Sequence, residues 1–274
     1  MAGHMISLYL LERGHNVFGY SRRKTDLVQS FNFSLLDQNQ LKEVIGKVDP
    51  DVVVNCVGVL NQAAENNKAE AVYINSYLPH LLSSILRGTE KKLVHLSTDC
   101  VFSGKRGVYR DTDIPDGQTF YDRSKALGEV KDDQNLTFRN SIIGPDISSD
   151  GIGLFNWFMA QKNEINGYTK SIWSGVTTLT LAKAIERATE VELVGLYQLS
   201  NNNKISKYDL CLLFNKHFRE NRLKIHPIEG VVQDKSLLRS EKPFDFFVPS
   251  YEQMIEEMAD WLKQHKILYK HYGL

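Results

Sequence analysis

Tyr121 and Lys125 form a Tyr-x-x-x-Lys pair, the strongest chemical feature of the sequence. The pair falls at the predicted start of a helix, where residues four apart share one face, so the ammonium group of Lys125 is expected near the phenol of Tyr121. A cation there favours the phenolate and lowers the phenol pKa from about 10 toward working pH. Tyr121 can then exchange a proton with a carbonyl oxygen while a nicotinamide delivers hydride to the carbon. The spacing therefore indicates carbonyl redox chemistry.

Thr98 is the expected companion of this pair. It closes an apolar run, Leu93 to Ser97, that reads as a buried strand, and its hydroxyl is placed to hydrogen-bond the same carbonyl oxygen. The context matters because Tyr-x-x-x-Lys occurs again at Tyr20 and Lys24, and among 12 tyrosines about one chance match is expected. The second copy follows no such strand and opens no helix. Either pair alone is also compatible with a surface tyrosine beside a solvated lysine.

The elements that must position these residues alternate between strands and helices. Continuous β-branched runs such as 51–55 are typical of parallel strands buried on both faces. The order predicts an α/β fold with a doubly wound parallel sheet, in which ligands bind beyond the carboxyl ends of the strands. The expected strands are 17–20, 51–55, 93–97 and 136–143, and the expected helices are about 1–12, 37–48 and 68–86 and one from about 121.

From about residue 145 the alternation becomes irregular. Helices are expected near 179–190, 207–219 and 251–265, separated by polar loops. We interpret residues 145–274 as a smaller lobe that binds substrate, and residues 1–144 as the sheet domain. No linker rich in Pro, Gly or Ser marks the boundary, so its position is soft.

Composition excludes several classes of function. The 274 residues carry 33 basic and 33 acidic side chains, and this balance gives no electrostatic footprint for nucleic acid or an anionic membrane. The sequence has no apolar stretch long enough to span a bilayer and no signal-peptide pattern. Cys56, Cys100 and Cys211 lack metal-ligand spacing and fit small buried hydrophobes of a reducing compartment. We expect a cytoplasmic protein without a metal.

The motifs resemble the dTDP-4-dehydrorhamnose reductase family of extended short-chain dehydrogenases/reductases. Residues 97–104, S-T-D-C-V-F-S-G, resemble its S-T-D-Y-V-F-D-G, and residues 121–129, Y-D-R-S-K-A-L-G-E, resemble its Y-G-x-x-K-x-x-G-E. Weaker likenesses are found at 51–55, 73–75, 139–145 and 173–178. The likeness is strong up to residue 145 and weak beyond it.

The resemblance implies a catalytic set of Thr98, Tyr121 and Lys125. It implies NADPH-dependent reduction of the 4-keto group of a nucleotide-linked 6-deoxysugar, dTDP-4-dehydrorhamnose in that family, for surface polysaccharide synthesis. NADH is the alternative cofactor, and a homodimer is the assembly left open. Two other functions stay open: epimerisation or dehydration on the same fold, and a non-catalytic regulatory role like that of the methionine adenosyltransferase subunit.

The candidate substrate residues follow from the same motifs. Cys100 stands where the family usually has tyrosine, and Ile143 where many members have an aromatic residue, so the identity of the sugar stays open. Trp157 and Trp173 border a pocket or belong to the core, where large aromatics are more often found. The substrate set is Asp99, Cys100, Val101, Phe102, Ser141, Ile143, Trp157 and Trp173.

The resemblance also implies a Rossmann-type cofactor site in residues 1–144. Arg22 and Arg23 follow the second strand of the family pattern and favour the 2′-phosphate of NADPH, or form a solvated turn. Asp37 lies near the adenine or caps a helix. The remaining candidates are Gly3, Asn55, Cys56, Val57, Gly58 and Ser97, together with Tyr121 and Lys125, which also belong to the catalytic set.

The family motif G-x-x-G-x-x-G is incomplete in this sequence. Gly3 matches its last glycine, and the first strand and two glycines would precede Met1. Three interpretations stay open: a natural protein about 8–10 residues longer, a variant with impaired cofactor binding, or another segment that fills the place of the strand.

Overall fold

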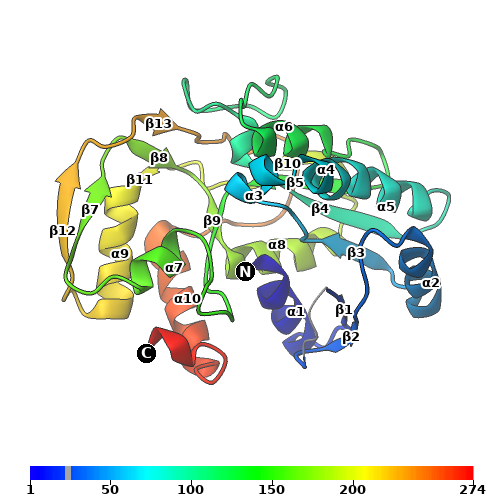
Figure 1. Ribbon diagram of the computed structural model, residues 1–274, viewed down its shortest axis with the longest axis horizontal. Coiled ribbons are helices and arrows are strands. Elements are labelled where there is room, and N and C mark those ends of the chain that lie inside the picture. The colour runs from blue at the N-terminus through cyan, green and yellow to red at the C-terminus, as the bar shows by residue number, and fades with distance from the viewer. Residues whose placement is uncertain (22–25, 274) are drawn as a thin grey trace.

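The computed structural model describes residues 1–21 and 26–273, and a four-stranded parallel sheet lies at its centre (Figure 1). Its strands are β3 (Val52–Asn55), β4 (Lys92–Thr98), β5 (Leu136–Asn140) and β10 (Gly195–Gln198). They are hydrogen-bonded in the order β10-β5-β4-β3, and every pairing is parallel. The predicted α/β fold with a parallel sheet is confirmed.

Helices cover both faces of this sheet (Figure 1). On β4, Leu93 and Val94 are both fully buried and belong to different hydrophobic clusters, because neighbouring side chains of a strand point to opposite faces. One face carries α3 (Asn61–Asn66), α4 (Lys68–Ala71), the π-helical turn η1 (Val72–Tyr77), α5 (Leu78–Leu86) and α6 (Phe120–Leu127). The other carries α1 (Ala2–Glu12) and α8 (Thr178–Thr189), which pack against each other.

A second, two-stranded sheet lies near α1. It pairs β1 (Phe18–Tyr20) with β2 (Gln29–Phe31), of which the sequence predicted the first and missed the second. The chain then enters α2 (Gln38–Val48). Among the described residues no strand pairs with the other edge of β3, so no described segment takes the place of a further strand there.

The remaining elements form a lobe on the other side of the molecule (Figure 1). Its strands pair in small sheets, β6 with β9, β7 with β12, and β8 with β11 and β13. The strands are β6 (Ile142–Ile143), β7 (Glu164–Tyr168), β8 (Ser171–Trp173), β9 (Val176–Thr177), β11 (Ile205–Ser206), β12 (Lys224–Ile228) and β13 (Gln233–Asp234). The helices are α7 (Leu154–Met159), α9 (Lys207–Arg219) and α10 (Tyr251–Gln264), followed by the 3-10 turn η3 (Lys270–Tyr272). Another 3-10 turn, η2 (Asp99–Val101), directly follows β4 of the central sheet.

The chain crosses between the two regions more often than the sequence pattern indicates. After building part of the lobe it returns to contribute α8 and β10 to the sheet layers. The predicted boundary near residue 144 stays a prediction, and this return is a feature that the pattern did not reveal.

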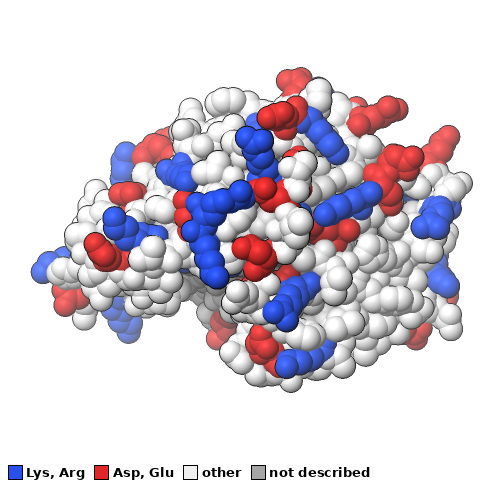
Figure 2. Space-filling model, turned by 90° about the horizontal axis from the view of Figure 1, so that it is seen from above, with Lys and Arg blue, Asp and Glu red and all other residues white. Residues whose placement is uncertain are grey.

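The charged side chains are mixed over the surface. Figure 2 shows Lys and Arg interspersed with Asp and Glu across the face seen from above. Within the described residues, no helix combines the length and the apolar character that a membrane span requires.

Candidate active site

The start of α6 places Tyr121 and Lys125. Thr119 caps the helix by accepting a hydrogen bond from the backbone N–H of Asp122, while the Asp122 carboxylate accepts one from the backbone N–H of Thr119. This reciprocal capping box satisfies two of the free N–H groups at a helix start. Glu65 accepts a third, from the N–H of Phe120 at 2.7 Å. The predicted helix start is confirmed. Tyr121 lies on the first turn of this helix and is 8% exposed.

Thr98 ends β4 and faces the tyrosine. Its hydroxyl oxygen accepts the N–H of Cys100 at 3.1 Å and caps η2, and the hydroxyl donates to Asp99 Oδ1 at 3.1 Å. The Thr98 side chain also lies next to the Tyr121 phenol, whose pKa it acts to lower. The structure therefore brings together two members of the predicted catalytic set at the carboxyl end of a central strand.

The environment of Tyr121 changes one expectation. Burial raises the pKa of the Tyr121 phenol, the nearby Cys100 thiol adds to the rise, and the Thr98 side chain opposes it. The predicted lowering by Lys125 is not what this structure shows, because loss of solvation outweighs other influences on a group so deeply buried. Tyr121 is thus held as the neutral phenol, the form that can donate a proton.

Thr98 and Tyr121 together form what we call the catalytic corner. Lys125 lies beneath this corner and is 4% exposed. Its ammonium donates to the carbonyl oxygen of Leu96 at 2.7 Å. Burial lowers the pKa of Lys125 to about 8, although the Glu129 carboxylate acts in the opposite direction. In the described structure the hydrogen bonds of Lys125 are therefore made to β4. The spacing predicted Tyr121, one helical turn before Lys125, as its partner.

His95 is a residue of this site that the sequence reasoning missed. It is fully buried on β4, where its Nδ1 lies 3.2 Å from Asn55 Nδ2 and its Nε2 lies 3.4 Å from Lys125 Nζ. Parallel pairing of β3 with β4 sets Asn55 opposite His95. A histidine inside an apolar strand pattern carried no signal of this contact, since the register between the strands is needed to see it.

A second missed residue, Lys235, reaches the corner from the lobe. Its ammonium faces the Cys100 thiol and the carboxylates of Asp99 and Asp122, which hold its pKa above the usual value despite burial. Burial raises the pKa of Asp99, and Lys235 and the Ser141 side chain oppose that rise. Asp99, Cys100 and Ser141, predicted to bind substrate, are thus brought together beside Thr98.

Behind the corner lies a fully enclosed ion pair. Arg139 donates to both oxygens of Glu129, through Nε to Oε1 at 2.8 Å and Nη2 to Oε2 at 2.7 Å. Ser97 donates to Glu129 Oε1 at 2.8 Å, and Arg139 also donates to Gln198 of β10 at 3.1 Å. Ser97, predicted to bind cofactor, therefore serves the ion pair in this structure.

The other candidate substrate residues divide by exposure. Val101 and Phe102 are fully buried, and Phe102 stacks on Tyr109 with ring centroids 4.1 Å apart, so both pack beneath the site. Ile143 and Trp173 also lie in the core, where the Trp173 ring lies 5.7 Å from Tyr251. Their predicted contact with substrate stays a prediction, and the burial of Trp173 agrees with the core alternative for that residue. Trp157 on α7 is 44% exposed.

Several candidate cofactor residues lie around the loop that follows β3. A Cβ added to Gly3 would meet the Cβ of Cys56 at 3.7 Å, so the start of α1 approaches the loop after β3. The Cys56 thiol stays protonated, because burial raises its pKa to about 12. Nothing in the packing requires glycine at position 58, where an added Cβ would meet Asn75 Oδ1 at 3.5 Å. Next to it the N–H of Val57 is bonded to Asn55 Oδ1.

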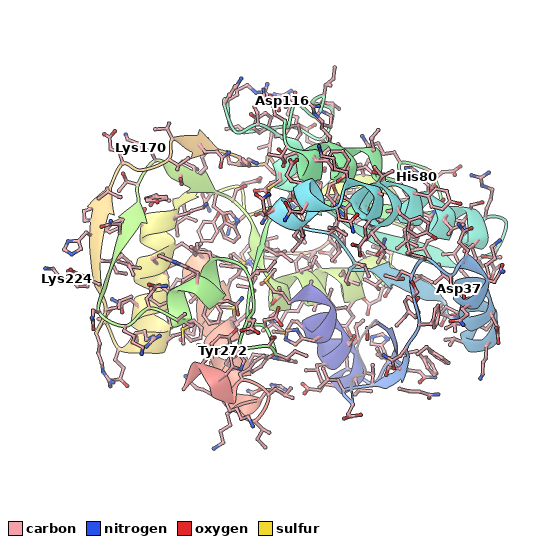
Figure 3. The ribbon with its side chains drawn as sticks, in the orientation of Figure 1. Asp37, His80, Asp116, Lys170, Lys224 and Tyr272 are labelled. Atoms are coloured by element: carbon pink, nitrogen blue, oxygen red, sulfur yellow. The ribbon has the colours of Figure 1, made fainter. Side chains whose placement is uncertain are left out.

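Asp37 begins α2 (Figure 3), where its carboxylate accepts hydrogen bonds from the N–H groups of Asn39 and Gln40. The capping interpretation is therefore confirmed. The same residue borders an open depression of the surface together with Ser34, Leu36, Gln38 and Asn39. Arg22 and Arg23 lie outside the described residues. In the part of the chain that the structure describes, no three His, Cys, Asp or Glu side chains are grouped to hold a metal ion.

A parallel sheet with helices on both faces, and a threonine, tyrosine and lysine around the end of a central strand, define the class. This is the arrangement of the short-chain dehydrogenases/reductases. A family model described as the RmlD substrate binding domain matches residues 2–143, just over half of the chain, and the chain belongs to this family. The family that the motifs predicted is confirmed.

Curated relatives are similar over parts of their length. The probable low-salt glycan biosynthesis reductase Agl14 of Haloferax volcanii is 30% identical over 133 residues, covering 47% of this chain and 44% of that protein. The spore coat polysaccharide biosynthesis protein SpsK of Bacillus subtilis is 27% identical and covers 65% of each. Methionine adenosyltransferase 2 subunit beta of Xenopus laevis is 23% identical, covering 77% of this chain and 66% of its own. The chain thus spans less than two thirds of the length of each of these proteins.

Solved structures share the fold more completely. A hypothetical dTDP-4-dehydrorhamnose reductase from Sulfolobus tokodaii has a TM-score of 0.74 at 24% identity, covering 92% of this chain and 94% of its own. A dTDP-4-dehydrorhamnose reductase from Bacillus anthracis, in complex with NADP, has a TM-score of 0.70 at 20% identity, covering 84% and 88%. At these identities the likeness establishes the fold.

Proposed function

We propose that the chain is a reductase that uses NADPH to reduce the 4-keto group of a nucleotide-linked 6-deoxysugar, as dTDP-4-dehydrorhamnose reductases do, in surface polysaccharide biosynthesis. The single observation that carries the proposal is the contact between Thr98 and a buried, protonated Tyr121 at the carboxyl end of β4. A protonated phenol matches the reduction direction, in which the carbonyl oxygen must gain a proton.

The residues present suit a dinucleotide. Gly58 has no packing reason to be glycine, which is consistent with close approach of a ligand to the backbone. Gly3 on the first turn of α1 would meet the pyrophosphate, Lys125 below the tyrosine would hold the nicotinamide half, and Asp37 beside its open depression would hold the adenine half. The bound cofactor supplies the hydride. The basic pair Arg22 and Arg23 supports NADPH over NADH.

The chain's own groups then have distinct tasks. Tyr121 donates its proton to the substrate oxygen as that oxygen becomes an alkoxide, and Thr98 hydrogen-bonds the same oxygen and fixes its position. Asp99 and Lys235 flank this corner and contact the hydroxyl groups of the sugar. A cytoplasmic location and a homodimer stay predictions.

The test follows NADPH by fluorescence and absorbance. The protein is titrated with NADPH and with NADH, and is then supplied with dTDP-4-dehydrorhamnose. We expect tighter binding of NADPH and net loss of its absorbance at a rate that depends on the sugar. An epimerase or dehydratase would convert sugar with no net loss of NADPH. Binding of neither cofactor would overturn the proposal.

Tyr121→Phe is the sharpest variant for this function. Loss of the phenolic proton donor should reduce turnover by about a thousand-fold, within the range of general acid–base catalysis, and leave the Kd for NADPH within about two-fold. Ser7→Ala, on α1 away from the corner, provides a control of unchanged turnover. Full activity in Tyr121→Phe would contradict the assignment.

A regulatory subunit is the second candidate, and the methionine adenosyltransferase relative favours it because that match covers more of this chain than the other two relatives described. It predicts binding to a partner enzyme without turnover of any keto sugar. Absence of turnover together with retained NADPH binding would therefore favour this candidate.

A further inference from the structure

Three buried side chains form a line beneath the candidate active site. Asn55 of β3, His95 of β4 and Lys125 of α6 are 4%, 0% and 4% exposed. Successive nitrogen atoms are 3.2 Å and 3.4 Å apart, from Asn55 Nδ2 to His95 Nδ1 and from His95 Nε2 to Lys125 Nζ. The roles assigned to Thr98, Tyr121 and Lys125 in catalysis make no use of this histidine.

The orientation of the Asn55 amide fixes one end of the line. The backbone N–H of Val57 lies 3.2 Å from Asn55 Oδ1 and can only donate, so the amide oxygen must face Val57. The amide nitrogen, which also only donates, therefore faces His95 Nδ1. His95 Nδ1 must therefore accept this hydrogen bond, so it carries no proton.

The proton of a neutral imidazole then resides on Nε2 and points toward Lys125. His95 is neutral, because complete burial holds its pKa well below the usual value and the nearby Lys125 charge acts in the same direction. An ammonium group can only donate hydrogen bonds. A charged Lys125 would therefore point an N–H group at the Nε2–H group of His95, with no acceptor between them. A neutral amine can accept from the N–H. One donor of Lys125 is still used by the carbonyl oxygen of Leu96.

We propose that His95 is a positioning residue for Lys125, held by Asn55 in the Nε2–H form so that this N–H opposes a positive charge on the lysine. The proposal deepens the proposed function and rests on it only for the role given to Lys125. In the absence of this contact Lys125 would hold its proton more firmly, and any step that depends on its charge would shift in pH.

The other groups around Lys125 act in known directions. The Cys56 thiol on the loop after β3 and the Glu129 carboxylate, one turn beyond Lys125, both favour the charged lysine, while burial opposes it. His80 of α5, labelled in Figure 3, influences His95, and its own Nε2 is bonded to the carbonyl oxygen of Leu127. Tyr121 precedes Lys125 by one turn of α6. Among these groups, His95 is the one whose nitrogen lies within hydrogen-bonding distance of Lys125 Nζ.

The test is nuclear magnetic resonance of the full chain with labelled histidine and lysine. Long-range correlations between ring protons and ring nitrogens identify the tautomer of His95. The side-chain carbon next to Nζ reports the titration of Lys125, with Lys125→Met used to assign its signal. We expect the Nε2–H form in the unchanged protein. In His95→Phe the Lys125 pKa should rise from about 8 by about one unit.

Two further variants make the result specific. Asn55→Leu releases Nδ1 to carry the proton, so Nε2 becomes an acceptor and the Lys125 pKa should also rise. Thr137→Val is the matched control. Thr137 is the buried residue of β5 that pairs with His95 in the sheet, and its hydroxyl donates to the carbonyl oxygen of Val130 rather than to His95. It should leave the Lys125 titration unchanged.

The Nδ1–H tautomer in the unchanged protein would overturn the inference. So would an unchanged Lys125 titration in His95→Phe. If either variant fails to fold, the tautomer in the unchanged protein still decides. These signals require no substrate, so a failure of the proposed function would appear separately, as absent NADPH turnover.

Discussion

Two buried polar clusters lie side by side at the end of β4, and burial affects them in opposite ways. In the ion-pair cluster, burial alone would raise the pKa of Glu129, but the bonds from Arg139 and Ser97 outweigh it and the pKa falls below its usual value. In the catalytic cluster, burial lowers the pKa of Lys125 and raises that of Tyr121. The first cluster has partners for its charges within the protein. The second has too few, and a ligand would complete it.

Arg139→Met should give the largest change in stability. It would leave the Glu129 carboxylate buried without its cation, and removal of one partner of a buried pair destabilises by about 3–5 kcal/mol. Urea unfolding at pH 7 measures the loss. The double variant Arg139→Met, Glu129→Leu should recover most of it, because no unpaired charge remains. A loss below about 1 kcal/mol in the single variant would show that the pair is less enclosed than the structure indicates.

Lys125→Met should change the free energy of unfolding in the opposite direction to Arg139→Met. Because the folded pKa of about 8 is below the ordinary value of 10.5, the unfolded chain binds more protons between these two pH values. This group's contribution to stability therefore rises as the pH goes from 8 to 10.5, and its full penalty is present below pH 8. We expect Lys125→Met to raise the free energy of unfolding at pH 7 by about 1–3 kcal/mol.

The pH dependence provides the control for this second change. The advantage of Lys125→Met should shrink as the pH rises from 8 through 10.5, because the lysine of the unchanged protein loses its proton in the folded state first and in the unfolded state above 10.5. Equal unfolding free energies of the two proteins at pH 7 would remove the contrast between the clusters.

The smallest effect is expected outside both clusters, at the N-cap of α2. Asp37→Ala should lower the free energy of unfolding by about 1 kcal/mol, since two N–H groups lose their acceptor. Asp37→Asn keeps a capping oxygen and should retain most of the stability. A weaker Kd for NADPH in both variants would add an adenine contact to the capping role, whereas an unchanged Kd would leave the cap alone.

Sequence reasoning succeeded where a local pattern determines the structure. The apolar run before Thr98, the cap at Asp37 and the four-residue spacing of Tyr121 and Lys125 are all local features of a few neighbouring residues. These signals located the catalytic corner and the helices around it. The π-helical turn at 72–77 lies inside a helix that the pattern predicted correctly in extent, but its hydrogen-bond spacing leaves no trace in residue types.

The parts that sequence reasoning missed depend on register and on distant contacts. His95 meets Asn55 because of how β3 pairs with β4, and Lys235 reaches Cys100 from a segment that follows β13. The lowered Tyr121 pKa was wrong for the same reason, because spacing along a helix does not reveal how deeply the phenol is buried. Desolvation and charge pairing are properties of the assembled tertiary structure.

The return of the chain to the central sheet has a consequence for the order of folding. β10 pairs with β5, and Gln198 bonds to Arg139 across a separation of 59 residues. A polypeptide emerging from the ribosome must expose the outer edge of β5 until this later segment arrives, and loop closure over such a distance slows the final pairing. The strand that completes the sheet also completes the surroundings of Arg139. The catalytic corner therefore reaches its final geometry as a late event, after much of the lobe has been synthesised.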